Sequence, residues 1–189
     1  MFCDEAPLLF HVDAMVRHFG AHGKPTVNAL GDALARVGRN HEPELLQELV
    51  EERLLTTWAV RRYVGSAWSG CEYPEDALRS EQWSELFLWA GYTVDGKRAD
   101  LPASPLVLFR GASYERRYGW SWTDDCNVAR WFADRSSGGY PASPASVWQA
   151  TVEPWRLFAR NVSTREGEPE YVVDTDDLDI TECERVEPE

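Results

Sequence analysis

Three short segments in the second half of the sequence combine polar side chains with apolar, strand-like runs. The first, LVLFRG at residues 106–111, ends an apolar run in an arginine and a glycine. A guanidinium can grip phosphate through two parallel hydrogen bonds, and a glycine lets the backbone come close to a ligand. Arg110 and Gly111 are therefore candidates for contact with a phosphate-bearing ligand, although an arginine at a strand end is by itself more often an ordinary surface charge.

The second segment, GWSWTDDCNVARWFA at residues 119–133, places Ser121 between two tryptophans and leads into a helix-like pattern. A hydroxyl on a half-buried strand needs a hydrogen-bond partner, which makes Ser121 a candidate site residue. Thr123 suits the N-cap of the helix, a role that it would fill in any protein. Core packing is the default for Trp120 and Trp122, while either ring could also stack on a planar ligand.

The third segment, REGEPEYVVD at residues 165–174, leads from a polar loop into an apolar run. Residues two apart on a strand face the same side, so Glu168 and Glu170 are expected side by side. Two neighbouring carboxylates raise each other's pKa, which favours a cleft that uses them over a purely structural role. The alternative is a solvated acidic loop at the start of an acidic tail.

Taken together, the order of these segments resembles the Arg–Ser–Glu branch of the ADP-ribosyltransferase superfamily. The matching triplets are Phe109-Arg110-Gly111, Ser121-Trp122-Thr123 and Glu168-Pro169-Glu170, and the pair Ala129 and Phe132 and the stretch Val152-Glu153-Pro154 are also similar. The resemblance covers residues 106–174. Only ten residues separate Arg110 from Ser121, a spacing closer to compact bacterial or phage members than to the well-known toxins, which have a longer segment there. The N-terminal helices are the candidate for the cleft wall that such a segment provides.

The resemblance implies transfer of ADP-ribose from NAD+ with release of nicotinamide, without a metal. Glu170 would stabilise the oxocarbenium-like ribose, as a carboxylate does in glycoside hydrolysis. Ser121 would hold Glu170 in position, and Glu168 would orient the acceptor, for which a protein arginine is favoured because a carboxylate pairs with a guanidinium. The dinucleotide would be bound by Arg110 at its phosphates, together with Gly111, Ser121, Trp122 and Thr123.

Two other functions stay open at this stage: an NAD glycohydrolase on the same site, with water as acceptor, and a catalytically inactive acidic interaction protein or decoy. The net charge is −13. Residues 106–165 carry eight basic and five acidic side chains, whereas residues 166–189 carry one and eleven. The basic middle suits an anionic ligand. The acidic end makes nucleic acid a less favoured partner, and its concentration in one segment is unlike the broad acidic face of a decoy.

The pattern predicts an α+β fold: an N-terminal helical segment over residues 1–95, serving as cleft wall or for target recognition, and an NAD-binding core over residues 96–189. By the resemblance this core is a split mixed and antiparallel β-sheet of ADP-ribosyltransferase type with an acidic tail. Apolar spacing predicts helices over residues 7–18, 26–36, 41–64, 74–90 and 124–134. Short apolar runs predict strands over 106–110, 119–122, 147–152, 156–158 and 170–173, with 92–105 as the joint.

The remaining features concern the compartment and metals. No stretch approaches the roughly 20 apolar residues of a membrane span, and the start MFCDEAPLLF is acidic where a secretory signal is basic. We therefore expect a cytoplasmic protein, in the host cytoplasm if it is phage-encoded, with no membrane partner. The four cysteines are expected to be free thiols, with two disulfides as the alternative. His18 and His22 have zinc-compatible spacing without further ligands, and exposed helix histidines are the favoured interpretation.

Overall fold

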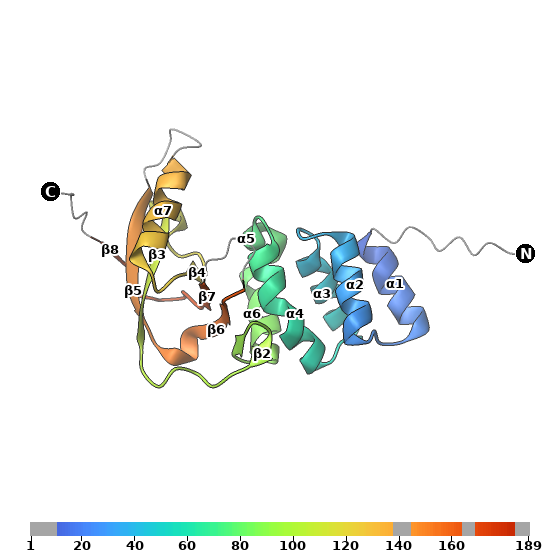
Figure 1. Cartoon of the computed structure of the whole chain (residues 1–189). Helices are drawn as coiled ribbons and strands as arrows, with labels where there is room; N and C mark the ends of the chain where they lie inside the picture. Colours follow the sequence, from blue (N-terminus) through green and yellow to red (C-terminus); the bar gives the residue numbers. More distant parts are fainter. Residues whose placement is uncertain (1–10, 138–144, 164–168, 184–189) are drawn as a thin grey trace, which may run out of the picture. The chain divides into compact units, whose positions relative to one another are not determined.

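The computed structural model describes residues 11–137, 145–163 and 169–183. The chain divides into two compact units, Met1–Gly91 and Tyr92–Glu189. The first is helical, and the second combines two β-sheets with a helix (Figure 1). The predicted α+β class and the mixed and antiparallel strand pairing are confirmed.

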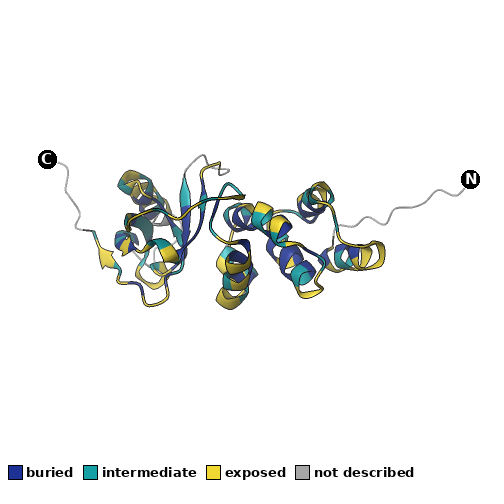
Figure 2. Ribbon diagram, turned by 90° about the horizontal axis from the view of Figure 1, so that it is seen from below, coloured by how far each residue is buried: buried dark blue, intermediate teal, exposed yellow. Residues whose placement is uncertain are grey.

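The first unit consists of short helices whose apolar faces are turned inward (Figure 2). Threonine caps begin two of them: the hydroxyl of Thr26 accepts from the amide of Ala29 at 3.2 Å, and that of Thr56 accepts from Ala59 at 3.3 Å. The helices are α1 (Val12–His22), α2 (Val27–Val37), α3 (Glu42–Glu51), α4 (Thr57–Gly70), α5 (Pro74–Ala77) and α6 (Ser80–Ala90). Among the described residues, none of these is long and apolar enough to cross a membrane.

Two segments that are each predicted as one helix, 41–64 and 74–90, form two helices each. The prediction of one helix over residues 41–64 is wrong because the chain turns at Arg53, which has φ 57°, before Thr56 caps α4. Trp58, an apolar residue within the predicted helix, is 57% exposed. The predicted helix over 74–90 is interrupted at Leu78, which is extended (φ −137°, ψ 153°) yet buried. In both cases the apolar spacing continues across the break, which is why the pattern hides it.

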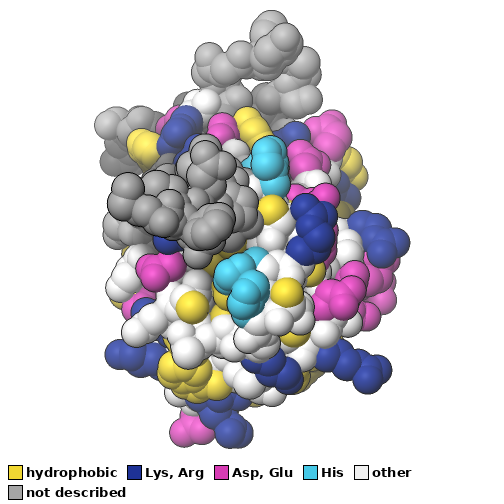
Figure 3. Space-filling view, turned by 90° about the vertical axis from the view of Figure 1, so that its right-hand side faces the viewer, with side chains coloured by type: hydrophobic (Ala, Val, Ile, Leu, Met, Phe, Trp, Pro, Cys, Tyr) yellow, Lys and Arg dark blue, Asp and Glu magenta, His cyan; other side chains and the backbone are white. Residues whose placement is uncertain are grey.

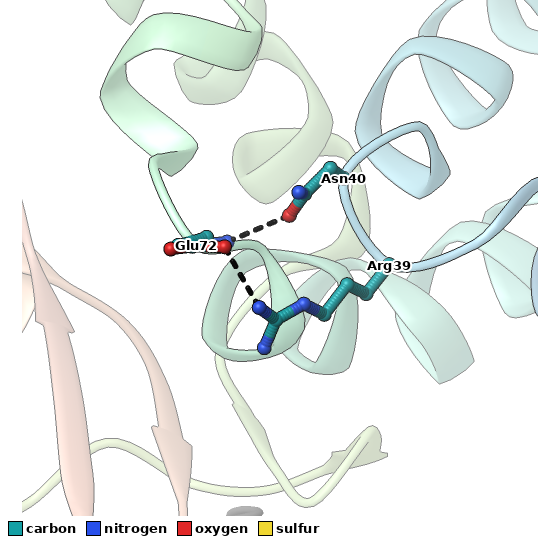
Figure 4. Close-up of polar contacts among 3 residues, drawn as sticks. All are labelled: Arg39, Asn40 and Glu72. Atoms are coloured by element: carbon teal, nitrogen blue, oxygen red, sulfur yellow. Dashed lines mark hydrogen bonds and ion pairs between the residues drawn. The ribbon is translucent and has the colours of Figure 1, made fainter.

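Aromatic rings and a surface ion pair join the helices of the first unit. The rings of Trp68 and Trp83 meet edge to face at 5.0 Å, and Phe87 stacks on Trp83 at 5.8 Å. The Arg39 guanidinium donates to the Glu72 carboxylate at 2.8 Å, and the Glu72 amide donates to the Asn40 side chain at 3.0 Å (Figure 4). These contacts tie the α2–α3 turn to the segment that follows α4.

The surface of the first unit mixes acidic, basic and small apolar areas on the face that carries α1 (Figure 3). A hollow of about 160 Å³ lies between α1 and α2, with Met15 and Phe19 in its apolar wall and His18 and Asp32 among its polar lining residues. The rings of His18 and His22 stack at 4.4 Å, and a ring nitrogen of His22 lies 2.8 Å from the carbonyl oxygen of His18.

The second unit contains two sheets. One has the strand order β2-β1-β6-β7-β4, with β1 parallel to β6 and the other pairs antiparallel, and the other has the antiparallel order β3-β5-β8. The strands are β1 (Thr93–Val94), β2 (Lys97–Arg98), β3 (Leu106–Ser113), β4 (Ser121–Trp122), β5 (Ala145–Val152), β6 (Leu157–Asn161), β7 (Glu170–Val173) and β8 (Thr181–Glu182). A short 3-10 turn (Tyr114–Arg116) separates β3 from β4, and another (Pro154–Arg156) separates β5 from β6.

Residues 92–105 are predicted from the sequence to be a turn-rich joint between the halves. That prediction is wrong in part, because the segment begins with a β-hairpin. Asp95 and Gly96 have φ 49° and 70° between β1 and β2, and an Asp-Gly pair with positive φ is the favoured two-residue hairpin turn. The Asp95 carboxylate accepts from the amides of Val162 and Ser163 at 2.8 and 3.0 Å. These bonds lower the pKa of Asp95 and fasten the hairpin to the end of β6.

Within the described residues the two sheets meet at a single bridge, and they enclose the core of the unit. Phe109 in β3 and Thr123 after β4 exchange backbone hydrogen bonds of 2.7 and 2.9 Å. Apolar side chains of both sheets pack together, and Leu108, Ala150, Trp122 and Val173 are among them. Helix α7 (Cys126–Ser137) packs on β3 and β5. This helix, predicted over 124–134, starts after Asp125, whose carboxylate accepts from the Asn127 amide at 2.8 Å.

Gly111 is the point where α7 comes closest to β3. A Cβ at this position would lie 1.9 Å from the carbonyl oxygen of Ala129 and 2.5 Å from the amide nitrogen of Ala133. We expect Gly111→Ala to lower the free energy of unfolding by about 3 kcal/mol, since both clashing atoms belong to a helix backbone. Urea denaturation measures this. The control is Gly20→Ala in α1, where an added Cβ meets nothing within 4 Å; equal stability of the two variants would contradict the close packing.

Candidate functional site

Arg110 lies on β3 beside the bridge between the sheets, and its guanidinium is committed to two carbonyl groups. Its Nε donates to the Arg116 carbonyl at 3.0 Å, and one terminal nitrogen donates to the Ser121 carbonyl at 2.8 Å. The residue opposite Arg110 on β5 is Trp148, so the two side chains share a face of the sheet. Arg110 therefore joins β3 to β4 and to the turn between them, and it is half-buried there.

Ser121 and Glu170 lie on neighbouring strands and face the same side of their sheet. Ser121 on β4 is paired with Val172 on β7, and Glu170 is two residues before Val172 on the same strand. Both side chains are half-buried. The structure thus brings the arginine, serine and glutamate of the three sequence segments onto adjacent strands, with Arg110 and Ser121 in direct contact.

Asn161, which the sequence analysis did not single out, holds the Glu170 carboxylate. It lies opposite Glu170 on β6, and its side-chain amide donates to Glu170 Oε2 at 3.3 Å. Asn161 is only 5% exposed, so it is a buried polar residue whose amide is used across the sheet. The resemblance assigns the holding of Glu170 to Ser121, and that role stays a prediction. The pairing of β6 with β7 gives Asn161 a hydrogen bond to Glu170, and only this register could have revealed it.

Three of the residues that are predicted to bind the dinucleotide have structural roles: Trp122, Thr123 and Gly111. Trp122 is 2% exposed and lies in the core, because it alternates with Ser121 and so faces the other side of β4. Its indole nitrogen donates to the Gly119 carbonyl at 2.8 Å. Thr123 is 6% exposed, and its hydroxyl accepts from the Asp125 amide, so that Asp125 and not Thr123 is the N-cap of α7. The open side of Gly111 faces α7.

Glu168, the predicted acceptor-orienting residue, lies outside the described residues. Its predicted pairing with Glu170 therefore stays a prediction.

A second polar group lies on the opposite face of the same strands. The Tyr171 hydroxyl donates to the Asp124 carboxylate at 3.3 Å, and the Arg160 guanidinium lies 3.8 Å from the same carboxylate and over the Tyr171 ring. Burial raises the pKa of Tyr171, while nearby Arg160 lowers it. The phenol accordingly keeps its proton at neutral pH and can donate it to Asp124. These contacts fix the start of α7 against β6 and β7.

The described part of the chain offers few side chains suited to metal binding or to thiol chemistry. No group of three or more histidine, cysteine, aspartate or glutamate side chains is arranged there to hold a metal ion. Cys71, Cys126 and Cys183 are free thiols, and burial raises the pKa of Cys71 and of Cys183. A raised pKa keeps these two sulfurs protonated and weakly nucleophilic at neutral pH.

Comparison of the chain with protein-family models, curated proteins and solved structures found no match. The interpretation of the site depends on its own residues and their geometry.

Arg110 is predicted to stabilise the fold as well as to carry a positive charge. We expect Arg110→Ala to lower the free energy of unfolding by about 1–3 kcal/mol, because the Arg116 and Ser121 carbonyls lose a charged donor. The matched control is Arg116→Ala, since Arg116 is exposed and joins this network through its backbone carbonyl. Thermal and urea unfolding measure the difference. An Arg116→Ala loss as large as that of Arg110→Ala would contradict the bridging role.

Proposed function

We propose that this chain is an NAD+-dependent ADP-ribosyltransferase that cleaves the nicotinamide–ribose bond and transfers ADP-ribose to an acceptor, most favourably a protein arginine. The observation that supports the proposal is that Arg110, Ser121 and Glu170 lie on the neighbouring strands β3, β4 and β7, with the Arg110 guanidinium bonded to the Ser121 carbonyl, in the order in which their motifs resemble the family. The two sheets joined by a single bridge are in keeping with the split sheet that the resemblance implies.

Glu170 is the residue to which we assign the chemistry. Cleavage of the nicotinamide–ribose bond builds positive charge on the ribose, and a fixed carboxylate stabilises that charge without having to reorganise. Glu170 begins strand β7, and Asn161 holds one of its oxygens by a hydrogen bond. An amide donor of this kind orients the carboxylate, so that it can accept from a ribose hydroxyl.

Arg110 is assigned to the phosphates of NAD+, where a planar guanidinium provides several donors at once. Two of its nitrogens are held by the carbonyls of Arg116 and Ser121, which fixes the position of the charge. Ser121 would contribute its hydroxyl beside Glu170. In this proposal Trp122, Thr123 and Gly111 shape the site through packing and internal hydrogen bonds rather than by binding the dinucleotide.

The acceptor is assigned through Glu168 alone. A carboxylate at that position would pair with the guanidinium of an incoming arginine and help to remove its proton. Water in place of arginine would make the same site an NAD glycohydrolase.

The proposal is tested with NAD+ labelled in its adenylate part and incubated with the protein and a cell lysate. We expect labelled protein and free nicotinamide with the wild type, and a loss of both by at least ~10²-fold in Glu170→Gln, since the charge that stabilises the ribose is removed. Glu182→Gln is the matched control, because Glu182 is an exposed carboxylate on edge strand β8. Full labelling by Glu170→Gln would refute the assignment.

The division of roles between the two glutamates gives a separate prediction. Glu168→Gln should keep NAD+ hydrolysis within about threefold of the wild type and lower transfer to arginine by at least tenfold, a difference of about 1.4 kcal/mol or more in transition-state energy. Nicotinamide release and label transfer to an arginine-containing peptide are measured in parallel. Equal loss of both reactions would show that Glu168 does not act on the acceptor.

A further inference from the structure

The turn between β3 and β4 carries an exposed group of aromatic rings around one arginine. The Arg117 guanidinium lies over the Tyr114 ring at 3.7 Å and over the Tyr118 ring at 4.5 Å. Tyr114 is 61% exposed and Tyr118 is 46% exposed. We refer to these three residues as the Tyr114–Arg117–Tyr118 cluster. Such exposure of two large rings next to each other calls for an explanation, since single exposed rings are ordinary but grouped ones mark binding surfaces.

The cluster is held in one arrangement by contacts on each side. The Arg117 guanidinium donates to the Tyr114 carbonyl, and the Tyr118 carbonyl accepts from the hydroxyl of Thr175. The Tyr114 ring meets Trp148 edge to face at 5.9 Å, and the Trp148 indole donates to the Ala112 carbonyl at 2.8 Å. The rings are therefore positioned before any ligand arrives, which lowers the entropy cost of binding.

The cluster also adjoins Arg110 along two paths. The Arg110 side chain donates to the Arg116 carbonyl, one residue before Arg117. Trp148, which braces Tyr114, lies directly opposite Arg110 on β5. Glu170 lies on β7, two strands from β3 through β4. Arg110 thus lies on a strand between the turn that carries the cluster and the strand that carries the carboxylate.

We propose that the Tyr114–Arg117–Tyr118 cluster binds the purine ring of the dinucleotide, so that NAD+ lies with its adenosine half at the cluster, its diphosphate at Arg110 and its nicotinamide ribose at Glu170. This rests on the proposed function for the positions of the diphosphate and the ribose. Exposed tyrosine faces stack on a purine, and the Arg117 charge adds a cation–π contribution and attracts the adjoining phosphate. The short segment between Arg110 and Ser121 thereby supplies a wall of the site, a role for which the N-terminal helices are the candidate from the sequence.

The two halves of the dinucleotide are tested separately by isothermal titration of AMP and of nicotinamide mononucleotide. Tyr114→Ala and Tyr118→Ala are expected to weaken AMP binding about tenfold each and to leave the affinity for nicotinamide mononucleotide unchanged, because only AMP carries the purine. Tyr114→Phe should keep the wild-type affinity for AMP, since the ring face is retained. The matched control is Tyr73→Ala, an equally exposed tyrosine (57%) in the helical unit.

The outcomes separate this inference from the proposed function. AMP that does not bind to the wild type, or that binds the alanine variants as tightly, overturns the cluster as a purine site even if NAD+ is consumed. An equal loss of affinity for nicotinamide mononucleotide overturns it as well, since the loss is then not specific to the purine. A wild type that fails to consume NAD+ removes the proposed transferase, whereas AMP binding that depends on Tyr114 and Tyr118 still supports the purine site. Melting temperatures within about 3 °C of the wild type confirm that the variants are folded.

Discussion

The second unit depends on how one arginine is held where its two sheets separate. In the part of the chain that the structure describes, the sheets share a single bridge, between Phe109 and Thr123. Beside that bridge the Arg110 guanidinium donates to the Ser121 carbonyl, so a charged side chain connects β3 to β4. The second bond of Arg110, to the Arg116 carbonyl, fixes the turn that follows β3. This half-buried cation at the junction between the sheets is the group to which we assign the diphosphate in the proposed function.

Polar groups are arranged on both sides of that arginine by ordinary strand pairing. On one side, β7 pairs with β6, so that Asn161 faces Glu170 and orients its carboxylate. On the other, β3 pairs with β5, so that Trp148 faces Arg110 and braces the aromatic turn. A ligand that combines a ribose, a diphosphate and a planar base would, in the proposed arrangement, contact the Glu170 carboxylate, the Arg110 guanidinium and the aromatic turn, respectively. The packing of α7 against Gly111 keeps the remaining face of β3 closed.

The type of some single segments, such as a strand, could be predicted from the sequence. Contacts that depend on which strands pair, and in which register, could not. The apolar run at 170–173 coincides with β7 because four buried or half-buried residues in a row are typical of a strand. The break at Arg53 and the exposure of Trp58 escaped prediction because the apolar spacing of two short helices imitates one long one. The Asp95–Gly96 turn was visible in the sequence and was assigned to the joint. The contact of Asn161 with Glu170 could not be predicted, since it depends on which residue of the neighbouring strand lies opposite Asn161.

The most direct measurement is a crystal structure of the protein with a non-hydrolysable NAD+ analogue. We expect a hydrogen bond of about 2.6–3.2 Å between the Glu170 carboxylate and a hydroxyl of the nicotinamide ribose, with the diphosphate in contact with the Arg110 guanidinium. An analogue bound elsewhere on the chain, or one whose nicotinamide ribose lies out of hydrogen-bond reach of Glu170, would contradict it.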